Sequence, residues 1–562
     1  MRTMAWLVWV VALVSCDRGP AEPADLVLRG GAVRTMEPSS PTASAVAVRS
    51  GRIVYVGDDA GAEAFLGPAT EVVELAGRMV LPGFHDTHVH PVSGGTALGD
   101  CDLYGAESRA DLVQLVVACA ARQEGAAWMR GDGYSPTIFA DGAPPRELLD
   151  SLVPDRPVYL EDATGHAAWV NGRALTVAGI DARTPDPAPD GIIVRREDGS
   201  PQGTLREAAM GLVARHIPPH TDAELGAGLD RALAMAASLG ITTLHEVGGD
   251  ERVLRAYADA ERAGRLTARV LVALVADPTR GGGQVAELAT LRDGFEGRLA
   301  RTVAVKIFLD GVIEGGTAAL LDPYLDRPGW RGELRAQSPD TLAELVTALD
   351  SAGFKIHVHA IGDRAVRAAL DALARSRERG GGSGPRHILA HLQLIDPTDI
   401  PRLAQLGVVA SFQPLWAYRD RYIVELTEPR LGAERSGRLY PIESVRASGT
   451  TVAGGSDWPV TTMDPLDAIE VAVRRLDPAV AGGEAWIPTE RLLLDDALRA
   501  YTVNGAVAGD LEAESGSILT GKSADLVVLE RDLYAIEARE ISDVRVDLTI
   551  FEGRIVYRRP ES

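Results

Sequence analysis

The chain has 562 residues, of which 57 are basic and 79 acidic, giving a formal net charge of −22. Nucleic-acid binding needs clustered cationic side chains, so this balance argues against it. Hydrophobic residues make up 46% and charged residues 24%, as in an ordinary soluble globular protein, and a chain of this length is expected to form two or three domains.

The N-terminus predicts export to the periplasmic or extracellular side of a bacterial membrane. A basic residue precedes an uncharged, mostly apolar run over 4–14. A membrane-spanning helix needs about 20 residues, so this shorter run is typical of a signal-peptide core. The run leads into Leu13-Val14-Ser15-Cys16, which resembles a bacterial lipoprotein signal and implies removal of 1–15, lipidation of Cys16 and a tether over 16–23. The alternative is a simple secretory signal with an incidental cysteine.

Short strands separated by glycine-containing turns are predicted at both ends of the remaining chain. Ala24-Asp25-Leu26-Val27-Leu28 is echoed by Ala524-Asp525-Leu526-Val527-Val528-Leu529, and Gly51-Arg52-Ile53-Val54-Tyr55 by Gly553-Arg554-Ile555-Val556-Tyr557. The matching phrases predict one β-sandwich assembled from 24–82 and 510–562, with a second domain inserted between them.

The first candidate site residues end the strand that follows this N-terminal region. Pro82-Gly83 marks a turn, and the next short run ends in His88-Val89-His90. Residues two apart on a strand point to the same face, so the two imidazoles are placed to hold one metal ion. Taken alone, a His-x-His pair is weak evidence, and an ordinary structural role is an equal alternative.

The segment 94–217 is the least regular part of the chain and predicts an inserted subdomain, because Pro, Gly and Asp are frequent in it. Residues 128–133 form a candidate second barrel strand. The segment contains Cys101 and Cys119, the two cysteines that remain besides Cys16. They can pair in an oxidising compartment, and free buried thiols are an equal alternative.

Beyond this segment, helices and strands alternate. An amphipathic helix is predicted over 221–239, with Gly240 as its stop, before a strand over 241–247. Parallel barrel strands gather their C-terminal ends at one face, so strands that end in metal-binding side chains predict a TIM-type (β/α)8 barrel over 83–509. The other predicted elements are helices over 341–352, 365–375 and 489–504, strands over 271–275, 408–412 and 450–457, and strands that end near Lys306, His359 and His391.

Five phrases in the same order carry a family resemblance. They are Leu81-Pro82-Gly83 through His90, Gly165-His166-Ala167-Ala168-Trp169-Val170-Asn171, Val305-Lys306-Ile307-Phe308-Leu309-Asp310-Gly311, His359-Ala360-Ile361-Gly362-Asp363 and Gly455-Ser456-Asp457-Trp458-Pro459. Together they resemble the metal-dependent amidohydrolase superfamily and, within it, the amidohydrolase-3 (YtcJ-like) family, from about Ala24 to Tyr557. The resemblance implies the same composite sandwich, an insertion that helps cover the active site, and a small-molecule substrate.

Such a site predicts metal-assisted hydrolysis. A divalent cation lowers the pKa of its bound water to about 7 and polarises the substrate carbonyl. The resemblance implies two cations, with zinc preferred over manganese, iron or nickel at an imidazole-rich site. The expected ligands are His88, His90, Lys306, His359, His391 and Asp457.

Lys306 is the most diagnostic of these residues, because a charged amine is costly to bury inside an apolar strand. An ion pair with Asp310 or Glu314 would offset that cost. The resemblance points instead to reaction of the amine with carbon dioxide, giving an anionic carbamate that bridges two metals. A lysine acting directly in catalysis is a third alternative.

Strand position separates the expected ligands from their neighbours. His359 lies nearer the end of its strand than His357, which is expected one layer deeper, and His391 is preferred to His387 for the same reason.

Asp457 is expected to bind metal, orient the hydroxide and carry its proton to the leaving nitrogen. The candidate substrate-binding residues are His166, Asp310, Gln413 and Trp416, with His245 on a third barrel strand as a further pocket candidate.

The sequence therefore predicts a membrane-tethered hydrolase of a non-peptide carbon–nitrogen bond in an amide, formamide or cyclic amide. One alternative is a lipid-anchored binding protein that keeps the fold without catalysis. Another is an enzyme that acts on esters, carbamates or dipeptides. The substrate does not follow from the architecture, and self-association into a homo-oligomer is left open.

Overall fold

The structure is a computed structural model that describes residues 22–139, 142–162, 167–187, 191–295, 297–336, 338–379 and 386–560. The predictions for the signal peptide 1–15, for Cys16 and for His166 lie outside these ranges. Within them, no helix has both the length and the apolar character needed to cross a membrane.

The centre of the molecule is a ring of eight parallel strands, which confirms the predicted barrel. Its strands are β8 (Phe84–Val89), β15 (Ile241–Gly249), β16 (Arg269–Ala276), β17 (Ala300–Phe308), β18 (Lys355–Ala360), β19 (Ile388–His391), β20 (Val409–Phe412) and β21 (Thr451–Gly454), paired in that order. The first and last strands meet, since Thr87 Oγ1 donates to Gly454 O at 2.9 Å and Asp457 N donates to His88 O at 2.7 Å. The barrel is therefore nearly closed.

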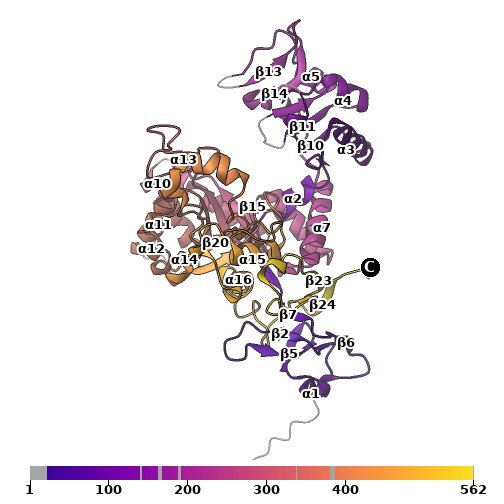
Figure 1. Ribbon diagram of the computed structural model, residues 1–562, viewed down its shortest axis with the longest axis vertical. Coiled ribbons are helices and arrows are strands. Elements are labelled where there is room, and N and C mark those ends of the chain that lie inside the picture. The colour runs from indigo at the N-terminus through magenta and orange to yellow at the C-terminus, as the bar shows by residue number, and fades with distance from the viewer. Residues whose placement is uncertain are drawn as a thin grey trace, which may run out of the picture.

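Helices alternate with these strands around the outside of the barrel (Figure 1). The helix α7 (Asp222–Ser238) begins at a capping box in which Thr221 and Glu224 satisfy each other's backbone N–H groups. Its apolar side, including Leu229 and Leu233, is buried in the main core. The other helices are α8 (Glu251–Arg262), α9 (Val285–Gly294), α10 (Pro339–Ser351), α11 (Asp363–Glu378), α12 (Ile400–Gln405), α13 (Glu428–Ser436), α14 (Ile442–Ala447), α15 (Pro465–Arg474), α16 (Leu494–Ala500) and α17 (Val503–Ala508).

Two details of this region differ from the sequence prediction. The helix expected over 489–504 is divided into α16 and α17, because Thr502 between them has non-helical backbone angles (φ −127°, ψ −95°). The strand that carries His245 is the second barrel strand, not the third, because β15 pairs directly with β8.

The two chain ends form a β-sandwich beside the barrel (Figure 1). Leu28 and Val46 of one sheet pack with Val80, Leu526 and Val528 of the other, and all five side chains are buried. One sheet has the order β5 (Arg52–Gly57), β4 (Ala45–Arg49), β1 (Leu26–Arg29) and β6 (Glu71–Glu74). The other combines both ends of the chain in the order β24 (Arg554–Arg558), β23 (Val546–Phe551), β22 (Leu526–Leu529), β7 (Met79–Pro82), β2 (Ala32–Arg34) and β3 (Thr42–Ala43).

A separate lobe follows α2 (Pro91–Ala97) and returns to the barrel at α7 (Figure 1). The prediction of a barrel strand over 128–133 is wrong, because β10 (Met129–Tyr134) pairs with β9 (Cys101–Asp102) and β11 (Val158–Asp162) in the sheet of this lobe. Cys101 of β9 and Cys119 of α3 (Arg109–Arg122) form a disulfide with a Cα–Cα distance of 5.3 Å, so the structure adopts the paired alternative. The lobe's sheet has the order β13 (Ile192–Arg195), β14 (Pro201–Arg206), β12 (Ala167–Val170), β11 (Val158–Asp162), β10 (Met129–Tyr134) and β9 (Cys101–Asp102), with helices α3 (Arg109–Arg122), α4 (Arg146–Leu152), α5 (Gly172–Ala178) and α6 (Gly211–Ala214).

Candidate metal centre

The structure brings the six expected ligands together at the C-terminal ends of the barrel strands. Lys306 Nζ lies 3.0 Å from His88 Nε2, and Asp457 Oδ1 lies 3.4 Å from that nitrogen and 3.2 Å from His90 Nε2. The ring of His391 lies 4.6 Å from that of His88 and 4.4 Å from that of His359, centroid to centroid. Residues separated by up to about 370 positions in sequence thus share one site because the parallel strands end together.

The backbone at this site is held in uncommon conformations. His391 and Asp457 have positive φ angles of 74° and 56°, which are unfavourable for residues with a Cβ atom and are often found at functional sites. Gly455 allows β8 to approach closely, since a Cβ there would lie 2.8 Å from the Cβ of His88.

A buried carboxylate clamps the seam between the first and last strands. Asp86 accepts hydrogen bonds from His88 N at 3.1 Å, Ser456 N at 3.0 Å and Ser456 Oγ at 2.5 Å. Burial raises the pKa of Asp86 to about 7, against these hydrogen bonds. The contacts fix the backbone on which both His88 and Asp457 depend.

Neighbouring groups decide which ring nitrogen of each histidine is available to a metal. His391 Nδ1 lies 2.8 Å from Gln413 Oε1, which only accepts, so His391 carries its proton on Nδ1 and its Nε2 is free. His88 Nδ1 lies 2.9 Å from His357 Nε2, which leaves His88 Nε2 facing Lys306 and Asp457.

His359 follows the same rule, whereas His90 has a carboxylate near each ring nitrogen. His359 Nε2 lies 3.2 Å from Gly311 O, so its Nδ1 is the free nitrogen. His90 Nδ1 faces Glu246 Oε1 at 3.9 Å, while its Nε2 faces Asp457. Metal-bound imidazoles generally direct their second nitrogen to such an acceptor, which fixes the ring and its tautomer.

The electrostatics favour neutral, metal-binding side chains. Burial lowers the pKa of His359 to about 3 and holds those of His88 and His391 well below the usual 6.5, and the charge of Lys306 acts in the same direction. These rings are neutral at physiological pH, as metal ligation requires. Burial also lowers the pKa of Lys306 to about 7, so a substantial fraction of this amine is uncharged. Four imidazoles, a carboxylate and a partly uncharged amine are a donor set that fits divalent transition metals.

The ion pair considered for Lys306 is not formed. The Asp310 carboxylate instead accepts backbone hydrogen bonds from Ala319, Ile361 and Gly362, at 2.9 to 3.1 Å. Glu314 accepts hydrogen bonds from Gln393 and Thr427. Asp310 therefore holds neighbouring loops together, and its Oδ1 also lies 3.5 Å from Nε2 of the expected ligand His359.

Two other substrate-binding candidates lie beside His391. Trp416 stacks on its ring at 5.6 Å with an interplanar angle of 2°, and its Nε1 donates to Thr461 Oγ1. Gln413 uses its oxygen for His391, while its buried Nε2 has no hydrogen-bond partner among the residues that the structure describes. Gln413 therefore offers an unused donor close to a candidate ligand. The further candidate His245 is buried, and its Nε2 likewise lacks a partner in the described part of the chain.

Sequence reasoning did not identify Glu246 as part of the site. It is only 2% exposed and accepts hydrogen bonds from Tyr257 Oη at 3.1 Å and Val92 N at 3.3 Å, next to His90. A carboxylate within an otherwise apolar predicted strand is the sequence signal that could identify it.

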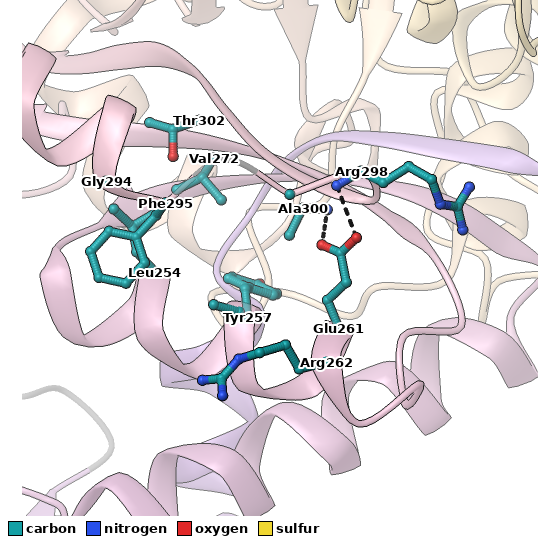
Figure 2. A pocket seen from close by; sticks show the side chains of 12 residues that line it. Leu254, Tyr257, Glu261, Arg262, Val272, Gly294, Phe295, Arg298, Ala300 and Thr302 are labelled. Carbon is teal, nitrogen blue, oxygen red and sulfur yellow. Dashed lines mark hydrogen bonds between the residues drawn. The ribbon is translucent and has the colours of Figure 1, made fainter.

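A separate cavity of about 440 Å³ lies outside the barrel between α8, α9 and the strands β16 and β17 (Figure 2). Glu261 borders it and accepts hydrogen bonds from the backbone N–H groups of Arg298 and Ala300. None of the six expected ligands lines this cavity. It touches the metal centre only indirectly, because its lining residue Tyr257 donates to Glu246.

A parallel barrel that gathers histidines, a lysine and an aspartate at its strand ends defines a metal-dependent hydrolase. The sequence model of the amidohydrolase family matches residues 71–557, and the chain belongs to this family. It is accordingly an enzyme that hydrolyses carbon–nitrogen bonds, as the resemblance implied.

Individual relatives agree with this assignment over nearly their whole length. The chain is 30% identical to the putative amidohydrolase YtcJ of Bacillus subtilis, covering 95% of this chain and 99% of the relative. It is 28% identical to the N-substituted formamide deformylase of Arthrobacter pascens, covering 96% and 99%. The crystal structure of an uncharacterized metal-dependent hydrolase from Pyrococcus furiosus superposes with a TM-score of 0.73 at 28% identity, covering 90% and 99%.

Proposed function

We propose that this enzyme hydrolyses a non-peptide carbon–nitrogen bond of a small molecule, in an amide, formamide or cyclic amide. The observation that carries the proposal is the convergence of free ring nitrogens on Asp457, whose Oδ1 lies 3.2 Å from His90 Nε2 and 3.4 Å from His88 Nε2. The formamide deformylase from Arthrobacter pascens supports the formamide class, because the match spans 99% of that protein.

One or two divalent cations, of which zinc suits the imidazoles best, would be held by His88, His90, Lys306, His359, His391 and Asp457. When bound, the metal supplies a nucleophilic water and polarises the substrate carbonyl. With a metal bound, Asp457 would accept a proton at a carboxylate oxygen and deliver it to the leaving nitrogen. The unused Nε2 donor of Gln413 binds the substrate, and Trp416 packs against His391 and excludes water from one side.

Lys306 is proposed to be carboxylated. The uncharged amine attacks the carbon of carbon dioxide, a nitrogen–carbon bond forms, and one proton leaves to solvent, giving an anionic carbamate with two oxygen donors. Burial of the amine, its pKa of about 7 and its position 3.0 Å from His88 Nε2 support this step. Asp310 and Glu314 are engaged elsewhere, so they do not neutralise a charged Lys306.

We further propose that the enzyme is a lipoprotein that acts on the outer side of a bacterial membrane. The signal-like run over 4–14 and Cys16 motivate this location. The Cys101–Cys119 disulfide supports it, since disulfides persist mainly in oxidising compartments. Labelling with a radioactive fatty acid and its loss in Cys16→Ser would test the anchor.

Metal removal and substrate screening test the hydrolase proposal. Dialysis against a chelator should abolish hydrolysis of N-formyl and N-acyl amines, and added zinc should restore it. Full activity in a metal-free protein would overturn the mechanism. A protein that binds a ligand with negligible metal content would instead be the non-catalytic binding protein, and turnover confined to esters, carbamates or dipeptides would change the bond.

A further inference from the structure

We infer that His357 is a positioning residue for the metal ligand His88: it accepts the Nδ1 proton of His88 and thereby aims the Nε2 lone pair at the metal position. The inference rests on the metal site of the proposed function. It assigns a task to a histidine that the hydrolytic chemistry itself does not use.

The geometry of the pair is that of a hydrogen bond between buried rings. His88 Nδ1 and His357 Nε2 are 2.9 Å apart, the ring centroids are 4.8 Å apart, and the planes meet at 71°. Each residue is only 1% exposed, so water does not compete for the contact. His357 lies on β18 two positions before His359, which places it on the same strand face, one layer deeper in the barrel.

Only one arrangement of protons is compatible with metal binding at this pair. A metal on His88 Nε2 needs the lone pair of that nitrogen, so the proton of the neutral ring must reside on Nδ1. His88 Nδ1–H then donates to His357 Nε2, which has to be the unprotonated nitrogen of its own ring. The reverse donation, from His357 to His88, would leave a proton on His88 Nε2 and block the ligand.

The neutral imidazole also suits the charges already buried around it. Asp457 and Asp86 are both less than 10% exposed close to His88. A carboxylate at position 357 would add another buried anion there, at considerable desolvation cost. His90, which is more exposed, faces the carboxylate of Glu246 instead. His357 thus provides an acceptor without adding charge.

Zinc affinity, measured on metal-free protein by competition with a chromophoric chelator, separates this role from simple packing. His357→Phe keeps an apolar ring of similar size but no acceptor, and should weaken zinc binding about 10–100-fold. His357→Gln retains an acceptor oxygen and should recover most of that loss. His387→Gln is the matched control, because His387 directly precedes the neighbouring strand β19 and contacts Asp350 and the Ile356 backbone rather than a ligand. The absorption spectrum of the cobalt-substituted protein should change in His357→Phe and not in the control.

The outcomes are distinguishable. Wild-type zinc affinity in a folded His357→Phe protein, or equal losses in the Phe and Gln variants, would overturn the inference while leaving hydrolysis intact. If the Phe variant does not fold, as judged by circular dichroism, His357→Asn replaces it, since the shorter amide does not reach His88. A wild-type protein that binds zinc without hydrolysing any amide would refute the proposed function, and the affinity comparison would still decide the role of His357. Absence of zinc binding by the wild type would overturn both.

Discussion

The barrel and the sandwich are both built from buried strands, yet their interiors have opposite chemistry. In the sandwich, Leu28, Val80 and Leu526 are fully buried and belong to one apolar cluster. In the barrel, Lys306 and His88 are equally buried. Burying apolar surface stabilises a fold, whereas burying amines and imidazoles costs free energy unless they are well partnered. The sandwich interior thus contributes only to stability, whereas the barrel, which also contains the main apolar core, carries the expected chemistry at its strand ends.

The largest loss of activity is expected for Asp457→Asn at the barrel site. This change keeps the shape of the side chain but removes its charge and its ability to carry a proton. Activity should fall by about 10²–10⁴-fold, the usual range for a lost proton-transfer group. The melting temperature of the metal-free protein should change little. Steady-state kinetics at saturating zinc measures the loss, and near-wild-type turnover would exclude Asp457 from proton transfer.

The converse change is Leu526→Ala in the sandwich. Leu526 is fully buried, so the cavity should lower the free energy of unfolding by about 2–5 kcal/mol. Turnover per folded, zinc-loaded molecule should remain that of the wild type. Denaturant unfolding together with active-site titration provides the test. A large loss of turnover in the folded fraction would show that the sandwich also shapes the site.

The disulfide provides a smaller effect confined to the inserted lobe. Cys101 and Cys119 are separated by 18 positions, and a crosslink closing a loop of that size stabilises by about 3 kcal/mol. The double variant Cys101→Ser, Cys119→Ser should unfold the lobe at lower denaturant concentration. Its zinc affinity should be unchanged, because neither cysteine contributes to the site. Reduction of the wild type should reproduce the same shift, and an unaltered unfolding curve would contradict the prediction.

The subtlest effect is a pH dependence of stability that arises from Lys306. Burial lowers its pKa from 10.5 to about 7 in the folded chain. Between these two values the unfolded chain binds more protons than the folded chain, so the stability of the metal-free protein should rise with pH across that window. Lys306→Met should show a shallower rise in urea titrations. Identical slopes would mean that Lys306 is charged when folded.

The sequence could predict the candidate ligands because, in a parallel barrel, functional side chains lie at the C-terminal ends of the strands. Lys306 and Asp457 each follow a short, mostly apolar run, and His88 and His90 share a face because side chains alternate along a strand. The same local reasoning assigned 128–133 to the wrong sheet. A strand pattern does not say which sheet the strand joins, and this one belongs to the inserted lobe.

Side-chain contacts between strands far apart in sequence could not be predicted from local patterns. His357 was expected to lie deeper than His359, but its pairing with His88 depends on the relative heights of β8 and β18, which no local pattern encodes. The place of Glu246 beside His90 depends on the register between β15 and β8, which slips twice along their length. The choice between paired and free Cys101 and Cys119 likewise required a distance across the lobe.

The Asp86 clamp closes the barrel at the junction that also carries two of the expected metal ligands, His88 and Asp457. This carboxylate joins the start of the ring to its end by binding Ser456 and the His88 backbone. A folding intermediate with that junction still open would hold His88 and Asp457 apart and would capture zinc poorly. The rate of zinc binding during refolding should therefore follow the closure of the barrel between β8 and β21. Spectroscopic probes of helix content do not resolve this step.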